Sequence, residues 1–175
     1  MKFILLLFLF PVYCFARIDV AFLELRTYDG KVIQLEPNGQ FAHIAISYQN
    51  KWLHAHPYRG VEIISTEALQ KIGAIKTIIT ISKKNSLNES VVKSFLNTPY
   101  DSSFTWGNDK LYCSELVAKL LNIQPQAMKF EASFWPQKFK NLRGQFGISP
   151  DDIFNFLKNR GYQSHDIKNQ CSKLF

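Results

Sequence analysis

The feature that most constrains the fold is a pair of alternating segments joined by two polar residues. Residues 40–48 read QFAHIAISY, residues 51–56 read KWLHAH, and Gln49-Asn50 lies between them. Alternation with a period of two is typical of β-strands, and a two-residue connection joins antiparallel strands in a tight hairpin. The sequence therefore predicts a β-hairpin within an antiparallel sheet.

The register of this hairpin brings histidines together. A two-residue connection places His43 opposite His56 and Ala45 opposite His54. All three histidines then lie on one face, with His54 diagonally within reach of the His43 side chain. A connection of odd length would move His54 and His56 to the other face of the hairpin. The alternative interpretation is that the histidines are scattered on a solvated hairpin without a common role.

The rest of the chain predicts strands first and helices later. Its 175 residues are typical of a single domain. Further strands are expected over residues 20–26, 61–64 and 74–82, and helices over residues 66–72, 87–96, 111–121 and 150–160. This order predicts an α+β fold in which a mostly antiparallel sheet packs against helices.

Capping residues mark two of the expected helices. Ser86 and Glu89 have the spacing of a capping box. Ser149, followed by Pro150 and two acidic residues, is typical of a helix start, and Gly161 is typical of a helix end. We therefore expect one helix to begin after Ser86 and another after Ser149.

The first residues differ from the rest of the chain. Lys2 is followed by an uncharged stretch rich in Leu and Phe, which ends at Ala16 just before Arg17. A membrane-spanning helix needs about 20 apolar residues, more than this stretch provides. A basic start, a short apolar centre and a small residue at its end predict a secretory signal peptide over residues 1–16. The folded domain is then residues 17–175.

Other interpretations of this segment stay open. It could form a buried helix, or a lipid-anchored signal built on Cys14, although the bulky Tyr13 stands where such signals need a small residue. A cleaved signal peptide predicts a periplasmic or secreted protein, and disulfides form in those compartments. There, Cys113 and Cys171 are either bridged or Cys113 is kept as a free thiol.

The net charge of +7 fits partners that carry negative charge. Such partners include envelope polymers and lipid headgroups, which predicts peripheral contact with the envelope or a membrane surface. Nucleic acid is disfavoured, because the sequence has no cluster of Lys and Arg interleaved with aromatic residues and starts with an export signal.

Cys113 stands where an irregular aromatic loop meets a predicted helix. The free amides and the positive dipole end of a helix start can stabilise a thiolate or an oxyanion. A buried structural cysteine is the alternative. The side chains expected either to line the approach to Cys113 or to pack a surface loop are Tyr100, Asp101, Phe104, Trp106 and Asp109.

Several segments together resemble the YiiX/YebB/YaeF-like permuted papain-fold hydrolases of the NlpC-type superfamily. The matching segments are PYD at 99–101, Phe104, LYCSELV at 111–117, AHIAI at 42–46, GV at 60–61 and SPDD at 149–152. The similarity extends from about residue 40 to about residue 160. It implies a permuted papain-like fold in which the histidine strand precedes the cysteine.

The resemblance also implies roles for individual residues. Cys113 would be the nucleophile and His43 the general base. The third, polar position falls on His54, where many relatives have Glu, and this is similar to the His–His–Cys arrangement of lecithin:retinol acyltransferase-type relatives. An imidazole supplies no fixed negative charge, and His56 competes for the same role. No cofactor and no metal are implied.

These residues together predict an exported cysteine hydrolase. It would cleave amide or ester bonds by thiol acyl transfer, on a peptidoglycan stem peptide or an acyl lipid, and the Phe- and Trp-rich loop slightly favours the lipid. Two alternatives stay open. The domain could be an inactive module that binds lipid or peptide, or Cys113 with the hairpin histidines could bind Zn²⁺.

Overall fold

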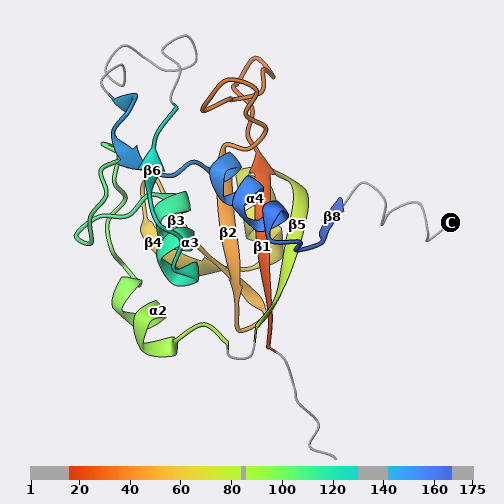
Figure 1. Ribbon diagram of the computed structural model, residues 1–175, viewed down its shortest axis with the longest axis vertical. Coiled ribbons are helices and arrows are strands. Elements are labelled where there is room, and N and C mark those ends of the chain that lie inside the picture. The colour runs from red at the N-terminus through yellow and green to blue at the C-terminus, as the bar shows by residue number, and fades with distance from the viewer. Residues whose placement is uncertain (1–15, 84–85, 130–141, 167–175) are drawn as a thin grey trace, which may run out of the picture.

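The computed structural model describes residues 16–83, 86–129 and 142–166 (Figure 1). Its centre is a six-stranded sheet with the strand order β4-β3-β2-β1-β5-β8, in which every neighbouring pair is antiparallel. The strands are β1 (Ala16–Glu24), β2 (His43–Tyr48), β3 (Lys51–His56), β4 (Gly60–Ile64), β5 (Ala74–Lys83) and β8 (Ser164–Asp166), with a separate pair β6 (Gln126–Ala127) and β7 (Phe146–Gly147). The predicted α+β class is confirmed.

The histidine hairpin forms with the predicted register. Ile46 pairs with Leu53 across β2 and β3, and both connecting residues, Gln49 and Asn50, have positive φ, as a type I′ turn requires. Strand β2 begins at His43 rather than at residue 40, because a carboxylate at the start of the last helix accepts the backbone N–H groups of residues 40 and 41.

In the described ranges, four helices cover the two faces of the sheet: α1 (Thr66–Ile72), α2 (Glu89–Phe95), α3 (Cys113–Leu121) and α4 (Pro150–Asn159). Helices α3 and α4 lie on the same side of the sheet (Figure 1). The core beneath them contains Ile44 and Leu53, whereas Ala45 and Trp52 pack with Leu69 of α1 on the other side. The alternation predicted for the hairpin therefore separates two apolar layers.

Two helix starts differ from the expectation. Helix α2 is capped by Asn88, whose side chain accepts from the N–H of Ser90, so Ser86 is not its N-cap. Helix α3 begins at Cys113 and not at Leu111, because the Leu111 N–H and C=O bond to the backbone of residues 99 and 101. Helix α4 begins as predicted after the N-cap Ser149, and the capping box expected at Ser86 is found here instead, between Ser149 and Asp152.

Some predictions fall on residues outside the described ranges. The signal peptide, apart from its last residue, lies there, and so do Cys14 and Cys171. Within residues 16–83, 86–129 and 142–166, no helix combines the length and apolar character that crossing a bilayer requires.

Candidate active site

Cys113 is the first residue of α3, and its thiol is free and buried. The N-cap residue, Tyr112, makes no side-chain hydrogen bond to the first turn, so the amides there are left for other acceptors. Helix α3 packs against β2 and β3, and Ser114 fixes its start by donating to the Ile148 carbonyl at 2.8 Å. The sequence places a thiol at a helix start, and packing holds that start against the histidine strand.

The thiol of Cys113 lies against the backbone of the residue that follows His43. It accepts hydrogen bonds from the amides of Ile44 and Ser114, both of which lower its pKa. Burial outweighs them and raises the pKa of Cys113 to about 11. Burial therefore opposes the thiolate that the helix start was expected to favour, because it stabilises the neutral thiol.

His43 and His54 contact each other directly. His43 Nε2 lies 3.0 Å from His54 Nδ1, and the two rings are nearly perpendicular at 87°. The side chains are 4% and 0% exposed, and burial lowers the pKa of His43 to about 3 and that of His54 to about 4. Both imidazoles are neutral, so each has one donor and one acceptor nitrogen.

The structure pairs His43 with His54 and not with His56. The ring of His56 is 6.0 Å from that of His54, and its Nδ1 accepts the backbone N–H of Tyr58 at 3.1 Å. Among the hydrogen bonds of the described residues, none joins the His43 ring to the thiol of Cys113. The thiol of Cys113 therefore contacts the backbone of β2 next to His43, while the imidazole of His43 contacts His54.

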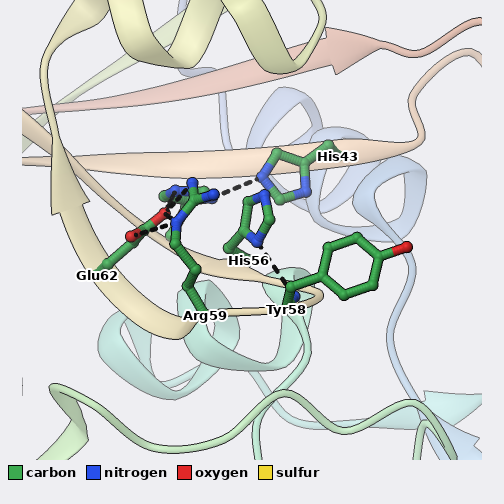
Figure 2. Close-up of polar contacts among 6 residues, drawn as sticks. His43, His56, Tyr58, Arg59 and Glu62 are labelled. Carbon is green, nitrogen blue, oxygen red and sulfur yellow. Dashed lines mark hydrogen bonds and ion pairs between the residues drawn. The ribbon is translucent and has the colours of Figure 1, made fainter.

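Glu62 extends the histidine pair, and the sequence interpretation missed it. Its Oε1 lies 3.2 Å from His54 Nε2, and Arg59 bonds to both carboxylate oxygens at 2.6–2.9 Å (Figure 2). Strands β3 and β4 pair His54 with Glu62, and the short turn between them is closed by Gly60 at φ 73°. Extending the hairpin logic to this second turn would have placed Glu62 opposite His54.

A small, mainly apolar cavity of about 40 Å³ lies beside the thiol. It is lined by Leu35, Ala42, Tyr100, Phe104, Tyr112, Cys113, Ser114, Ile148, Ser149 and Pro150. Two larger hollows, of about 560 and 580 Å³, contain neither Cys113 nor any hairpin histidine in their walls. The space beside Cys113 fits a small group, so a larger substrate requires the cavity to open.

The segment before Cys113, residues 99–112, is here named the cysteine loop. Asp101 is buried and accepts the N–H groups of Ser103 and Thr105 at 2.8 and 2.7 Å, which fixes the path of the loop. Tyr100 and Phe104 line the cavity, as one sequence interpretation expected. Trp106 instead packs under the ammonium of Lys119, and Asp109 is exposed.

Glu115 fastens the cysteine loop to α3. It is fully buried; its Oε1 accepts the Gly107 N–H at 2.8 Å and pairs with Lys119 at 3.1 Å. Burial is the main cause that raises its pKa. The sequence interpretation favoured compensation of the helix dipole for Glu115; its contacts show that it also anchors the loop.

The zinc interpretation finds no support in this geometry. His43 and His54 direct ring nitrogens at each other rather than at a common point. Within the part of the chain that the structure describes, no three His, Cys, Asp or Glu side chains form a group able to hold a metal ion.

Comparisons with known proteins give matches to one family. A family model described as a permuted papain-like amidase enzyme, YaeF/YiiX, C92 family, matches residues 19–155. The uncharacterized protein YiiX of Escherichia coli K12 is 23% identical over an alignment of 166 residues. The match covers 78% of this chain and 80% of that protein. The crystal structure of the metalloprotein yiiX from E. coli O157:H7 matches with a TM-score of 0.59 and 23% identity, over 78% of this chain and 90% of the other, and shares the fold.

Proposed function

This chain belongs to the permuted papain-like amidase family of the YaeF/YiiX type, and from this premise we propose that it hydrolyses an amide or ester bond through an acyl-enzyme on Cys113. The observation that carries the proposal is the meeting of Cys113, at an uncapped helix start, with the backbone of the His43 strand. His43 is the general base, and His54 orients its imidazole through the contact between His54 Nδ1 and His43 Nε2.

The neutral thiol and imidazole set the order of events. As the sulfur attacks the carbonyl carbon, the thiol proton passes to His43 Nδ1, since Nε2 is held by His54. The amide N–H groups of Cys113 and Ser114 donate hydrogen bonds to the developing oxyanion. The imidazolium then protonates the leaving nitrogen or oxygen, and a water, deprotonated by His43, hydrolyses the thioester and restores the thiol.

The mechanism includes a closing step. In the described hydrogen bonds the His43 ring is engaged with His54 and not with the thiol, so the mechanism requires a hydrogen bond between the sulfur and the imidazole to form when substrate enters the cavity. Catalytic hydrogen bonds commonly tighten in this way only in the substrate complex. The high pKa of Cys113 and the low pKa of His43 both keep the resting pair uncharged, which protects the thiol from oxidation.

The cavity and the sequence support two substrate classes. The apolar walls beside Cys113 favour the acyl part of a lipid, and a peptidoglycan stem peptide is the other envelope substrate that the resemblance implies. The +7 charge supports an anionic surface as the place of action, and the predicted signal peptide supports a periplasmic or secreted protein.

A metal is the remaining question, because the solved relative is described as a metalloprotein. The described residues of this chain do not fit one: the nitrogens of His43 and His54 that face each other are used in their mutual contact. No step of the mechanism is therefore drawn through a metal ion.

The test combines a substrate panel with thiol variants. Peptidoglycan peptides, N-acyl and O-acyl lipids are assayed with wild type, Cys113→Ala and Cys113→Ser, with Cys171→Ala as the matched cysteine control. We expect turnover of one class, an acyl adduct on Cys113 detected by mass spectrometry, and loss of both in the two Cys113 variants. Full turnover by Cys113→Ala contradicts the proposal, and binding without turnover by wild type favours the inactive binding module.

A further inference from the structure

The contact between His43 and His54 is part of a longer row that ends at an ion pair. Glu62 lies beyond His54, and Arg59 lies beyond Glu62, so that side chains from β2, β3, the β3–β4 turn and β4 contact one another in sequence (Figure 2). The row begins in the buried site and ends in solvent, since the side chain of Arg59 is 54% exposed and that of Glu62 is 23% exposed.

The chemistry at the outer end fixes the protons along the row. An ionised carboxylate accepts hydrogen bonds and donates none, and a guanidinium donates and accepts none. The Arg59–Glu62 pair therefore requires His54 to donate from Nε2, which leaves His54 Nδ1 as an acceptor. His43 must then donate from Nε2 to that acceptor, so its own proton cannot be on Nδ1.

We propose that Glu62, oriented by Arg59, is a positioning residue that sets the tautomers of His54 and His43 and leaves His43 Nδ1 free to accept the thiol proton. The inference deepens the proposed function and rests on it. The sequence interpretation found no fixed negative charge beside His43, because position 54 is an imidazole. Glu62 supplies that charge.

Glu62 and Arg59 act on the histidines with opposite sign. The carboxylate raises the pKa of His54 and the guanidinium lowers it, although burial has the larger effect on that pKa. The charged and titratable groups that act on the two rings are His56 on β3, Arg59 in the turn and Glu62 on β4, while Cys113 at the start of α3 contacts the backbone of Ile44. A positive charge on His54 is thus favoured by Glu62 and opposed by Arg59, and the pair acts on His43 through the contact between His43 and His54.

The first test reads the protons directly and needs no substrate. In protein labelled with ¹⁵N-histidine, the nitrogen chemical shifts of His43 and His54 report which nitrogen carries the proton. We expect Nε2–H on both rings of the wild type, and a mixed or reversed tautomer of His54 in Glu62→Ala, where the acceptor is removed. A proton on Nδ1 of His43 in the wild type overturns the proposal.

The second test uses the opposite signs. The rate of Cys113 alkylation by iodoacetamide is measured against pH in Glu62→Gln and Arg59→Gln. Glu62→Gln is expected to lower the plateau rate about tenfold, equivalent to about one pKa unit of base strength, and to move the acid limb to lower pH. Arg59→Gln is expected to move that limb to higher pH. A purely structural role predicts that both limbs stay in place or move in the same direction, and either result overturns the proposal.

The matched controls are Glu89→Gln and Lys93→Gln, which make the same charge changes in an exposed ion pair on α2. They are expected to leave the alkylation profile unchanged. The two proposals fail separately: turnover that survives Cys113→Ala defeats the hydrolase mechanism while the ¹⁵N shifts still test the tautomers. A reactive Cys113 with profiles indifferent to Glu62 and Arg59 defeats the positioning role alone.

Discussion

Two regions each hold half of the candidate active site, and they hold it in different ways. In the three consecutive strands β2, β3 and β4, residues 43–64, side chains bond to side chains: His43 to His54, and His54 to Glu62. The strands beneath them are already held by the sheet. The polar row is therefore an addition to a stable framework, and its removal affects proton positions more than it affects folding.

In the cysteine loop, by contrast, carboxylates bond to the backbone. Asp101 and Glu115 accept N–H groups of a segment that has no regular structure of its own. Buried backbone groups need such partners, and their loss is costly. Acidic side chains beside one site therefore serve chemistry among the histidines and folding in the cysteine loop. Substitutions can separate these two roles.

The largest effect is expected from Glu115→Ala. It removes the acceptor of the Gly107 N–H and leaves Lys119 without its buried carboxylate, which should lower the free energy of unfolding by about 3 kcal/mol. Urea denaturation measures this. The matched control is Glu89→Ala, which breaks an exposed pair and should cost at most about 0.5 kcal/mol. A loss for Glu115→Ala as small as that of the control would contradict the contrast between the regions.

Gly60→Ala tests the junction between the two regions. Gly60 has φ 73°, and a Cβ there would lie 2.3 Å from the backbone oxygen of Thr98, which also accepts the Val61 N–H. We expect a loss of about 2 kcal/mol in stability together with lower activity, because β4 must move away from the segment that leads to Cys113.

Gly30→Ala provides the control for that junction. Gly30 has φ 82° with nothing within 4 Å of the added Cβ, so it carries the backbone strain without the clash. Its expected cost is about 1 kcal/mol, with unchanged activity. Equal losses in both variants would show that the approach of Gly60 to Thr98 does not matter.

The sequence predicted the histidine side of the site better than its outer part. Period-two alternation and a two-residue turn determine the register of β2 and β3, and with it the contact between His43 and His54. The family resemblance found in the sequence is confirmed by the matching family model. Glu62 was missed because its role arises from a cross-strand neighbour, and a single polar residue in a short strand carries no periodic signal.

Loop and terminal features depended on contacts between distant residues. The start of β2 moved because Asp151, far along the chain, accepts two of its expected ladder donors. Strands β6, β7 and β8 have two or three residues each, too few to show a pattern. The state of Cys113 also escaped prediction, because the helix start favours a thiolate while the depth of burial, which favours the neutral thiol, is a property of the folded chain.

The pH dependence of stability should also separate the regions. The unfolded chain protonates a histidine near pH 6.5, whereas folding lowers the pKa of His54 to about 4 and that of His43 to about 3. Stability should therefore fall as the pH drops from 6.5 towards 4, by about 1.4 kcal/mol per pH unit for each buried histidine. Glu115, with its raised pKa, contributes with the opposite sign, losing stability as the pH rises above 4.5.

His54→Gln checks that assignment. It should reduce the slope of unfolding free energy against pH by about 1.4 kcal/mol per pH unit, as measured by urea denaturation between pH 4.5 and 6.5. His165→Gln, which changes an exposed histidine on β8, is the matched control. An unchanged slope in His54→Gln would mean that this imidazole is not held neutral by burial.

The smallest effect on stability is expected where the effect on chemistry is large. Glu62→Gln keeps an amide oxygen as acceptor for His54 and removes a charge whose ion pair with Arg59 is partly exposed, so the free energy of unfolding should change by at most about 0.5 kcal/mol. The same variant is expected to slow Cys113 alkylation about tenfold. Urea denaturation and alkylation of one preparation give both values, and a stability loss comparable to that of Glu115→Ala would make Glu62 a folding residue like those of the cysteine loop.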